Sequence, residues 1–128
     1  MEETGASERA GGWLARILAR FLSRLDNPKT LEELKAQVNR TQVENAGYEK
    51  HHIVGEGPNA GAIPDSQLQG EDNVVSIPYY IHRDISDYYS TKNESLGGMT
   101  PRDYLRGKSF EEQYQFGLKV MRMYGALK

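Results

Sequence analysis

The chain has 128 residues, of which 38% are hydrophobic and 27% charged, with a net charge of −2 and no cysteine. This length suits one domain with a modest core, and the missing cysteine excludes disulfides and cysteine-ligated metal knuckles. No apolar run is long enough to span a membrane. Residues 26–79 hold four Lys or Arg against nine Asp or Glu, whereas residues 80–128 hold eight against six. We therefore expect any nucleic acid to approach the C-terminal half.

Residues 1–12 are glycine-containing and are predicted to form a flexible leader. The next stretch, 13–25, has the three- and four-residue apolar spacing of an amphipathic helix, carried by Trp13, Leu14, Ile17, Leu18, Phe21, Leu22 and Leu25. Its separate polar face carries Arg16, Arg20 and Arg24. Such a helix can lie on a membrane surface or dock on a partner. Apolar helix faces usually pack on their own domain, and this is the arrangement we expect here.

Pro28 has no backbone N–H to donate and ends this first helix. Thr30 is a good N-cap, and two glutamates follow it in the first turn, so a second helix is predicted at roughly 31–41. Gly47 interrupts the pattern, and residues 48–54 have the composition of a strand.

Residues 55–72 contain four glycines and two prolines and are predicted to form a long ordered loop. A loop of this length in a compact domain is more often functional than incidental. A short strand of valines and isoleucine follows at 74–77 and is stopped by Pro78. Residues 79–91 then return to helical spacing.

Two capping patterns predict the remaining helices. Thr100 followed by Pro101 has the preferred order of cap and then proline at the start of a short helix. Ser109 with Glu112 forms a capping box before the final helix. The order of elements is thus helix, helix, strand, loop, strand, helix, helix, helix, which indicates an α+β, mostly helical fold.

All three histidines fall in one short constellation: the doublet His51-His52, then Asn73, then His82. Hydrolysis of a phosphodiester requires deprotonation of a water near neutral pH and neutralisation of charge on the phosphate and leaving oxygen. Histidine suits the first task because its ordinary pKa is about 6.5. A divalent cation held by neutral imidazoles suits the second. The constellation therefore indicates a one-metal phosphodiesterase centre.

The predicted elements can bring these residues together. Adjacent residues of a strand point to opposite faces, but at a strand end the backbone can twist, so that one imidazole of the doublet binds metal and the other faces the phosphate. Asn73 precedes the second strand and can bridge loop and strand through its amide, which would orient the base. His82 begins the following helix and can turn inward to complete the metal site.

Three stretches carry a resemblance to a known family: Glu49-Lys50-His51-His52-Ile53-Val54, Asp72-Asn73-Val74-Val75-Ser76-Ile77-Pro78, and His82. Together they resemble the ββα-metal fold of HNH endonucleases. They are similar to nuclease colicins and to the HNH-type domains at the C-termini of bacterial polymorphic toxins. The resemblance covers residues 48–90, about a third of the chain. It implies a single nuclease domain over residues 13–128, with the ββα core at about 48–91 between N-terminal helices at 13–41 and C-terminal helices at about 100–125.

The resemblance also implies a role for each residue of the constellation. His52 is the general base, His51 and His82 are metal ligands, and Asn73 positions His52. Glu49 is expected to support the doublet from behind the metal ligands. Family members cut nucleic acid, usually DNA, with Mg²⁺ or another divalent ion.

The toxin-like resemblance implies a bacterial protein that acts in the cytoplasm and is secreted or delivered as part of a larger toxin. A cognate immunity protein would then be its partner. The chain departs from the colicin pattern at Ser86, where those nucleases carry a further histidine ligand. Asp87, one residue later, is rotated by about 100° around a helix axis. Two imidazoles with waters fit Mg²⁺, although they would hold Zn²⁺ or Ni²⁺ more tightly, and Mn²⁺ also belongs to the candidate set.

Arginines of the C-terminal half are candidate phosphate contacts, namely Arg83, Arg102 and Arg106. The alternative to a nuclease is a non-catalytic binding or structural module. In it the histidines would hold a structural metal or none, and the helix at 13–25 would dock on a larger assembly. A closed structural zinc site usually has four protein ligands, so with three histidines and no cysteine it would also need a carboxylate.

Overall fold

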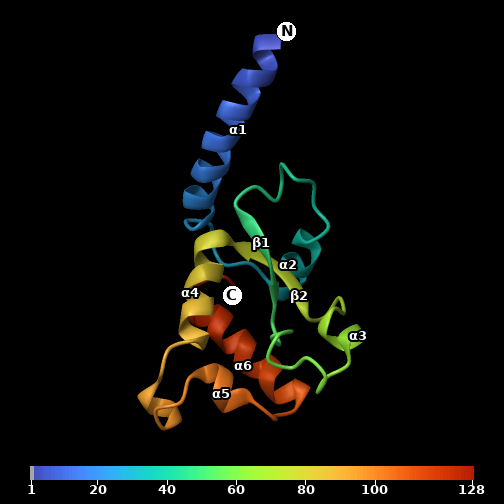
Figure 1. Cartoon of the computed structure of the whole chain (residues 1–128), viewed down its shortest axis with the longest axis vertical. Coiled ribbons are helices and arrows are strands. Elements are labelled where there is room, and N and C mark those ends of the chain that lie inside the picture. The colour runs from blue at the N-terminus through green and yellow to red at the C-terminus, as the bar shows by residue number, and fades with distance from the viewer. Residues whose placement is uncertain (1) are drawn as a thin grey trace.

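A computed structural model describes residues 2–128, with side chains from residue 12 onward, and shows a two-stranded hairpin packed against helices (Figure 1). The fold is mixed α+β and mostly helical, with a ββα-like arrangement in which α4 follows the second strand directly. The elements are α1 (Glu2–Ser23), α2 (Leu31–Gln37), β1 (Tyr48–His52), α3 (Asp65–Leu68), β2 (Val74–Pro78), α4 (Tyr79–Tyr89), the 3₁₀ turn η1 (Glu94–Leu96), α5 (Pro101–Leu105) and α6 (Phe110–Met123).

The hairpin determines where the histidine doublet lies. Strands β1 and β2 pair antiparallel, with Tyr48 opposite Pro78 and His52 opposite Val74. Every residue of β2 is buried, and the strand contacts both α2 and α4 as well as β1. This register places the end of β1, which carries the doublet, beside Asn73 at the start of β2.

The core lies between the hairpin, α2, α4 and the C-terminal helix α6. It consists of apolar side chains from each of these elements: Leu34, Ile53, Val75, Ile77, Ile81, Ile85, Leu118, Val120, Met121, Ala126 and Leu127. Burial of this apolar surface supplies the main driving force for folding. The histidines therefore lie at the edge of a packed core rather than on a loose loop.

The predicted helix caps are confirmed. Thr30 accepts from the Glu33 amide while the Glu33 carboxylate accepts from the Thr30 amide, which is a full capping box. Thr100 and Ser109 cap α5 and α6 through their hydroxyls, which accept from the Asp103 and Glu112 amides. The capping box predicted at Ser109 is confirmed only in this half, since the Glu112 carboxylate accepts from the Ser109 hydroxyl and not from its amide. The second helix is shorter than predicted, since α2 ends at Gln37 and turns occupy the following residues.

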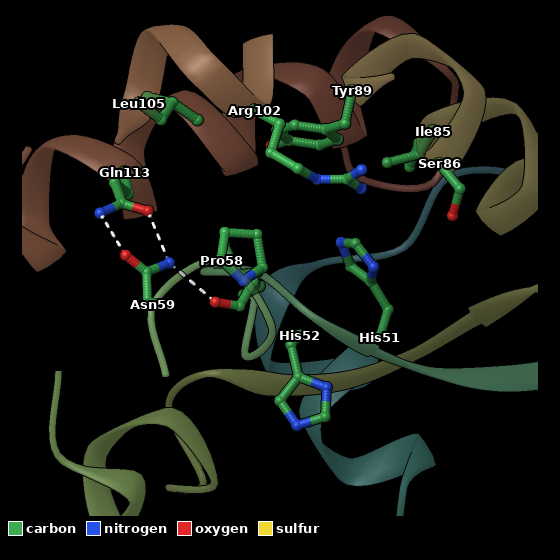
Figure 2. A pocket seen from close by; sticks show the side chains of 12 residues that line it. His51, His52, Pro58, Asn59, Ile85, Ser86, Tyr89, Arg102, Leu105 and Gln113 are labelled. Carbon is green, nitrogen blue, oxygen red and sulfur yellow. Dashed lines mark hydrogen bonds between the residues drawn. The ribbon is translucent and has the colours of Figure 1, made fainter. Parts of the chain in front are cut away.

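The predicted loop at 55–72 contains one element that its composition did not indicate, the single-turn helix α3. The loop is tied to α6 by a reciprocal amide pair (Figure 2). Asn59 Nδ2 donates to Gln113 Oε1 at 2.9 Å, and Gln113 Nε2 donates to Asn59 Oδ1 at 2.9 Å. Both side chains are buried, so this pair holds the loop against the C-terminal helix.

Helix α1 differs from its prediction in two respects. It begins at Glu2, so the stretch predicted as a leader over residues 1–12 continues the helix, and Met1 lies outside the described residues. The expectation that its apolar face packs on the domain was wrong. Six large apolar side chains of the helix and the turn after it are more than half exposed: Trp13, Leu14, Leu18, Phe21, Leu22 and Leu25.

The small and polar side of α1 makes most of its contacts with the domain, and the Phe21 ring adds one, 5.1 Å from the Tyr80 ring. Ser23 is buried and its hydroxyl donates to the Gly47 carbonyl at 2.9 Å. Gly47 has a φ of 80°, and a Cβ there would lie 2.3 Å from the Ala19 carbonyl oxygen. Only glycine fits this close approach, so the residue that separates the second helix from β1 also seats α1. In the described part of the chain no helix is both long and apolar enough to cross a membrane.

Candidate metal and catalytic centre

His51 is buried in the wall of a small cavity. Its ring points into a space of about 130 Å³ beside Arg102 and Ser86, while His52 turns the opposite way, as expected for neighbours on a strand (Figure 2). Only 7% of His51 is exposed, and its Nε2 has no hydrogen-bond partner. Buried polar atoms are nearly always paired, so an unpartnered imidazole nitrogen indicates a position at which a ligand can bind.

His82 lies next to His51. The two rings have centroids 5.1 Å apart and an interplanar angle of 71°. A ring whose nitrogen binds a metal at about 2.1 Å has its centroid roughly 3 Å from the ion, so two ligands at a tetrahedral angle have centroids roughly 5 Å apart. The spacing of the pair therefore fits one shared cation.

Glu49 orients His82. Its carboxylate contacts His82 Nδ1 across the start of α4. A neutral imidazole that donates from Nδ1 keeps its lone pair on Nε2, and a carboxylate behind a histidine ligand is a common arrangement at metal sites. Glu49 was expected to support the doublet, whereas in the structure its carboxylate contacts the third histidine, His82.

His52 has a different set of partners. Its Nε2 lies 2.9 Å from Gln69 Oε1, and Gln69 Nε2 donates to Glu56 Oε2 at 2.5 Å. Because the Gln69 NH₂ group donates to the Glu56 carboxylate, the Gln69 oxygen faces His52 and accepts a hydrogen bond from its Nε2–H. In the neutral ring the lone pair is then on Nδ1, which makes Nδ1 the nitrogen able to accept a proton.

Asn73 clamps the segment that follows the doublet. Its side chain is fully buried, with Oδ1 accepting from the Val54 amide at 2.8 Å and Nδ2 donating to the carbonyls of Val54 and Leu68 at 3.0 and 2.8 Å. It therefore bridges loop and strand, as the sequence analysis expected. Its amide bonds to backbone rather than to the His52 ring, so Asn73 acts on the doublet through the backbone.

An open hollow on the surface joins the three histidines to three cationic side chains. It is lined by Lys50, His51, His52, His82, Arg102 and Arg106, together with a glycine-rich turn that includes Glu56. Arg102 and Arg106 were expected as phosphate contacts and lie in this hollow. Arg83 does not line it; its guanidinium lies 5.8 Å from the centroid of the Tyr79 ring, near Arg20 of α1.

Ser86 occupies the position at which colicin-like nucleases would have a further histidine. It lines the same cavity as His51 (Figure 2), so this position faces the site and places a hydroxyl there instead of an imidazole. Asp87 is exposed on α4. Among the residues that the structure describes, no three His, Cys, Asp or Glu side chains form a group that could hold a metal ion.

Sequence reasoning missed three residues of this region: Lys50, Glu56 and Gln69. Glu56 is four residues beyond the doublet, and Gln69 seventeen, within a loop whose path no periodicity describes. The one sequence feature that could have indicated Glu56 was its position four residues after the doublet. The positions of Glu56 and Gln69 depend on how the loop folds back toward the doublet, whereas Lys50 lies in β1 itself.

Burial also affects the charge of His51. Desolvation, reinforced by the neighbouring His82 and His52, lowers its pKa from the ordinary 6.5 to about 3. The folded protein therefore keeps this imidazole neutral at physiological pH. A neutral ring is the form that binds a metal ion.

The pKa of His51 predicts an acid-sensitive stability. The unfolded chain binds this proton near pH 6.5 and the folded protein only near pH 3, so this group's contribution is complete above pH 6.5 and is lost as the pH falls toward 3. From pH 7 to roughly pH 4.5, the free energy of unfolding of His51→Gln should fall by about 2–3 kcal/mol less than that of the wild type. Urea unfolding of both proteins with chelator present measures this. Equal losses in the two proteins would contradict the buried neutral state.

The chain was compared with known proteins in three ways. No protein-family model matches it, and no curated protein or solved structure shows significant similarity to it.

Proposed function

We propose that this protein is a metal-dependent HNH-type endonuclease that hydrolyses phosphodiester bonds in nucleic acid, DNA in preference to RNA. The observation that carries the proposal is the pairing of a buried, unpartnered His51 Nε2 with the His82 ring at 5.1 Å, beside a separately held His52. The ββα-like arrangement and the motif that runs through it support the same conclusion.

The chemistry divides among the residues of the site. His51 and His82 would hold the ion, with His82 oriented by Glu49. When bound, a divalent cation neutralises charge on the phosphate and on the leaving 3′ oxygen. His52 accepts a proton from the attacking water at Nδ1, because Gln69 occupies its Nε2. The products expected from such a reaction carry 5′ phosphates.

The cations of the hollow are suited to holding the substrate. Lys50, Arg102 and Arg106 line it together with the histidines, so a phosphate chain that crosses the hollow would contact positive charge. Arg106 also pairs with Asp103 on α5 at 3.1 Å. Binding that depends on these side chains should weaken steeply with salt.

Cleavage of a supercoiled plasmid tests the proposal directly. The purified chain should nick the plasmid with Mg²⁺, Mn²⁺, Ni²⁺ or Zn²⁺, and chelator should stop the reaction. Failure to cleave DNA or RNA with any of these ions would overturn it. If chelator then also melted the domain, the protein would be the alternative, a module with a structural metal.

The His82→Ala variant tests the metal pair. Zn²⁺ or Ni²⁺ affinity, measured by calorimetry, should fall at least about tenfold, because His82 supplies one of two protein imidazoles. Asp87→Ala is the matched control, since this exposed carboxylate lies five residues further along the same helix, and the affinity of this variant should equal that of the wild type. Unchanged affinity in His82→Ala would remove this residue from the ligand set.

The toxin-like resemblance extends the proposal to the protein's setting. A bacterial host that makes this chain without a protector should grow poorly, and co-expression of a cognate immunity protein should restore growth. Residues 26–79, with four basic and nine acidic side chains and hence a net charge of 4 − 9 = −5, offer a surface for such a partner.

A further inference from the structure

Helix α1 extends away from the hairpin (Figure 1). It carries a broad apolar face that stays mostly exposed, although the Phe21 ring of this face lies 5.1 Å from the Tyr80 ring of α4. The six side chains of this face, which we call the α1 apolar face, are between 53% and 78% exposed: Trp13, Leu14, Leu18, Phe21, Leu22 and Leu25. Isolated exposed apolar residues are normal, but a contiguous group of this size marks an interaction surface.

The helix is held with this face outward by contacts on its other sides. Arg20 lies over the Tyr79 ring at 4.2 Å, and Arg24 pairs with Asp84 at 3.4 Å. Ser23 and the backbone of Ala19 meet Gly47. These contacts come from the hairpin and the start of α4, so the outward orientation results from specific packing at the C-terminal end of the helix.

The charge of the segment indicates the kind of surface it meets. Residues 12–25 contain three arginines and no acidic residue. Spaced by four, Arg16, Arg20 and Arg24 lie along one flank of the α1 apolar face, and Arg16 is exposed. A helix with Trp, Phe and Leu on one side and arginines beside them has the composition of helices that lie in a bilayer interface.

We propose that α1 docks this protein on a membrane surface rich in anionic lipid, with the α1 apolar face inserted among the acyl chains and Arg16 at the headgroups. This goes beyond phosphodiester hydrolysis and does not depend on it. A second copy that pairs through residues 12–25 fits less well, because this segment brings no negative charge to the arginines; the glutamates of α1 lie before it in the sequence, at positions 2, 3 and 8. Anionic headgroups supply both the charge and the apolar layer.

Trp13 makes the test direct, since it is the only tryptophan of the chain and lies on the inserting face. The full chain is mixed with vesicles of phosphatidylcholine alone or with added phosphatidylglycerol, and binding is followed by sedimentation and by Trp13 emission. Binding and a blue shift with the anionic vesicles only are expected. Equal binding to both, or no binding to either, would overturn the proposal. A blue shift on concentrating the protein without lipid would also overturn it, in favour of self-association.

Variants separate the apolar and electrostatic contributions. Leu18→Asp with Leu22→Asp should weaken vesicle binding at least about tenfold, since two inserting side chains become charged. Arg16→Gln should weaken it about fivefold, as expected for loss of one basic residue near an anionic bilayer. Met123→Asp, on a residue of α6 that is 55% exposed, is the matched control and should bind like the wild type. Wild-type affinity in the double variant would contradict the role of this face, and the wild-type vesicle result stands even if that variant misfolds.

Discussion

The His52→Ala variant is expected to lose plasmid cleavage by at least about a hundredfold while keeping its fold. A positioned general base contributes roughly 10²- to 10⁴-fold to such reactions, and alanine leaves no group to take the proton from water. His52 is held by Gln69 and lies outside the core, so the substitution should change stability little. Initial rates under saturating metal, with circular dichroism and thermal melting of both proteins, measure this.

Two glutamines at α3 provide a test of this result and its matched control: Gln69, which is the C-cap, and Gln67, which lies within the helix. Gln69→Ala removes the acceptor that holds His52 Nε2 and should slow cleavage about tenfold, by an effect on ring orientation comparable to that of the partners of metal ligands. Gln67→Ala alters an exposed side chain on α3 and should leave the rate unchanged. An equally active His52→Ala would exclude this residue as the base, whatever the glutamines do.

Asn73→Ala should produce the largest loss of stability of any single change at the site, about 3 kcal/mol or more. The substitution leaves the Val54 amide and the carbonyls of Val54 and Leu68 without partners in a fully buried position. Each buried polar group left unpaired costs about 1–3 kcal/mol. This is a large share of the roughly 5–15 kcal/mol by which a domain is stable.

Urea unfolding at neutral pH measures this effect, with Asn39→Ala as the control. Asn39 is exposed in the turn after α2, so its replacement should change the free energy of unfolding by less than about 0.5 kcal/mol. A loss below about 1 kcal/mol in Asn73→Ala would show that the loop and strand are held together by other contacts. The backbone that carries the doublet would then not depend on this amide.

Local patterns predicted most of the helices and both strands because the physics behind them is local. An N-cap is a residue directly before the helix whose side-chain oxygen accepts from an amide three residues later. Thr30, Thr100 and Ser109 do this. The strand-like composition of β1 and the stop at Pro78 are likewise local features of the sequence. The short helix α3 was missed, since four residues in a polar loop give no periodicity to read.

The approach of His51 to His82 followed from the order of elements, because a hairpin that feeds directly into a helix has few ways to fold back. The side chains that contact the His52 and His82 rings could not be predicted from the order of elements. Whether Glu49 contacts the doublet or His82 depends on the twist of β1, and the contact between His52 and Gln69 joins residues seventeen positions apart.

The sequence by itself determined that this is one mostly helical α+β chain with its histidines grouped around a hairpin, since spacing and capping act over a few residues. Only the tertiary structure decided that the α1 apolar face points outward and that Arg83 stands away from the hollow. Periodicity states which side of a helix is apolar, but it contains no information about what covers that side. That depends on long-range packing, here the close approach of Gly47 to Ala19, which seats the helix on its small and polar side.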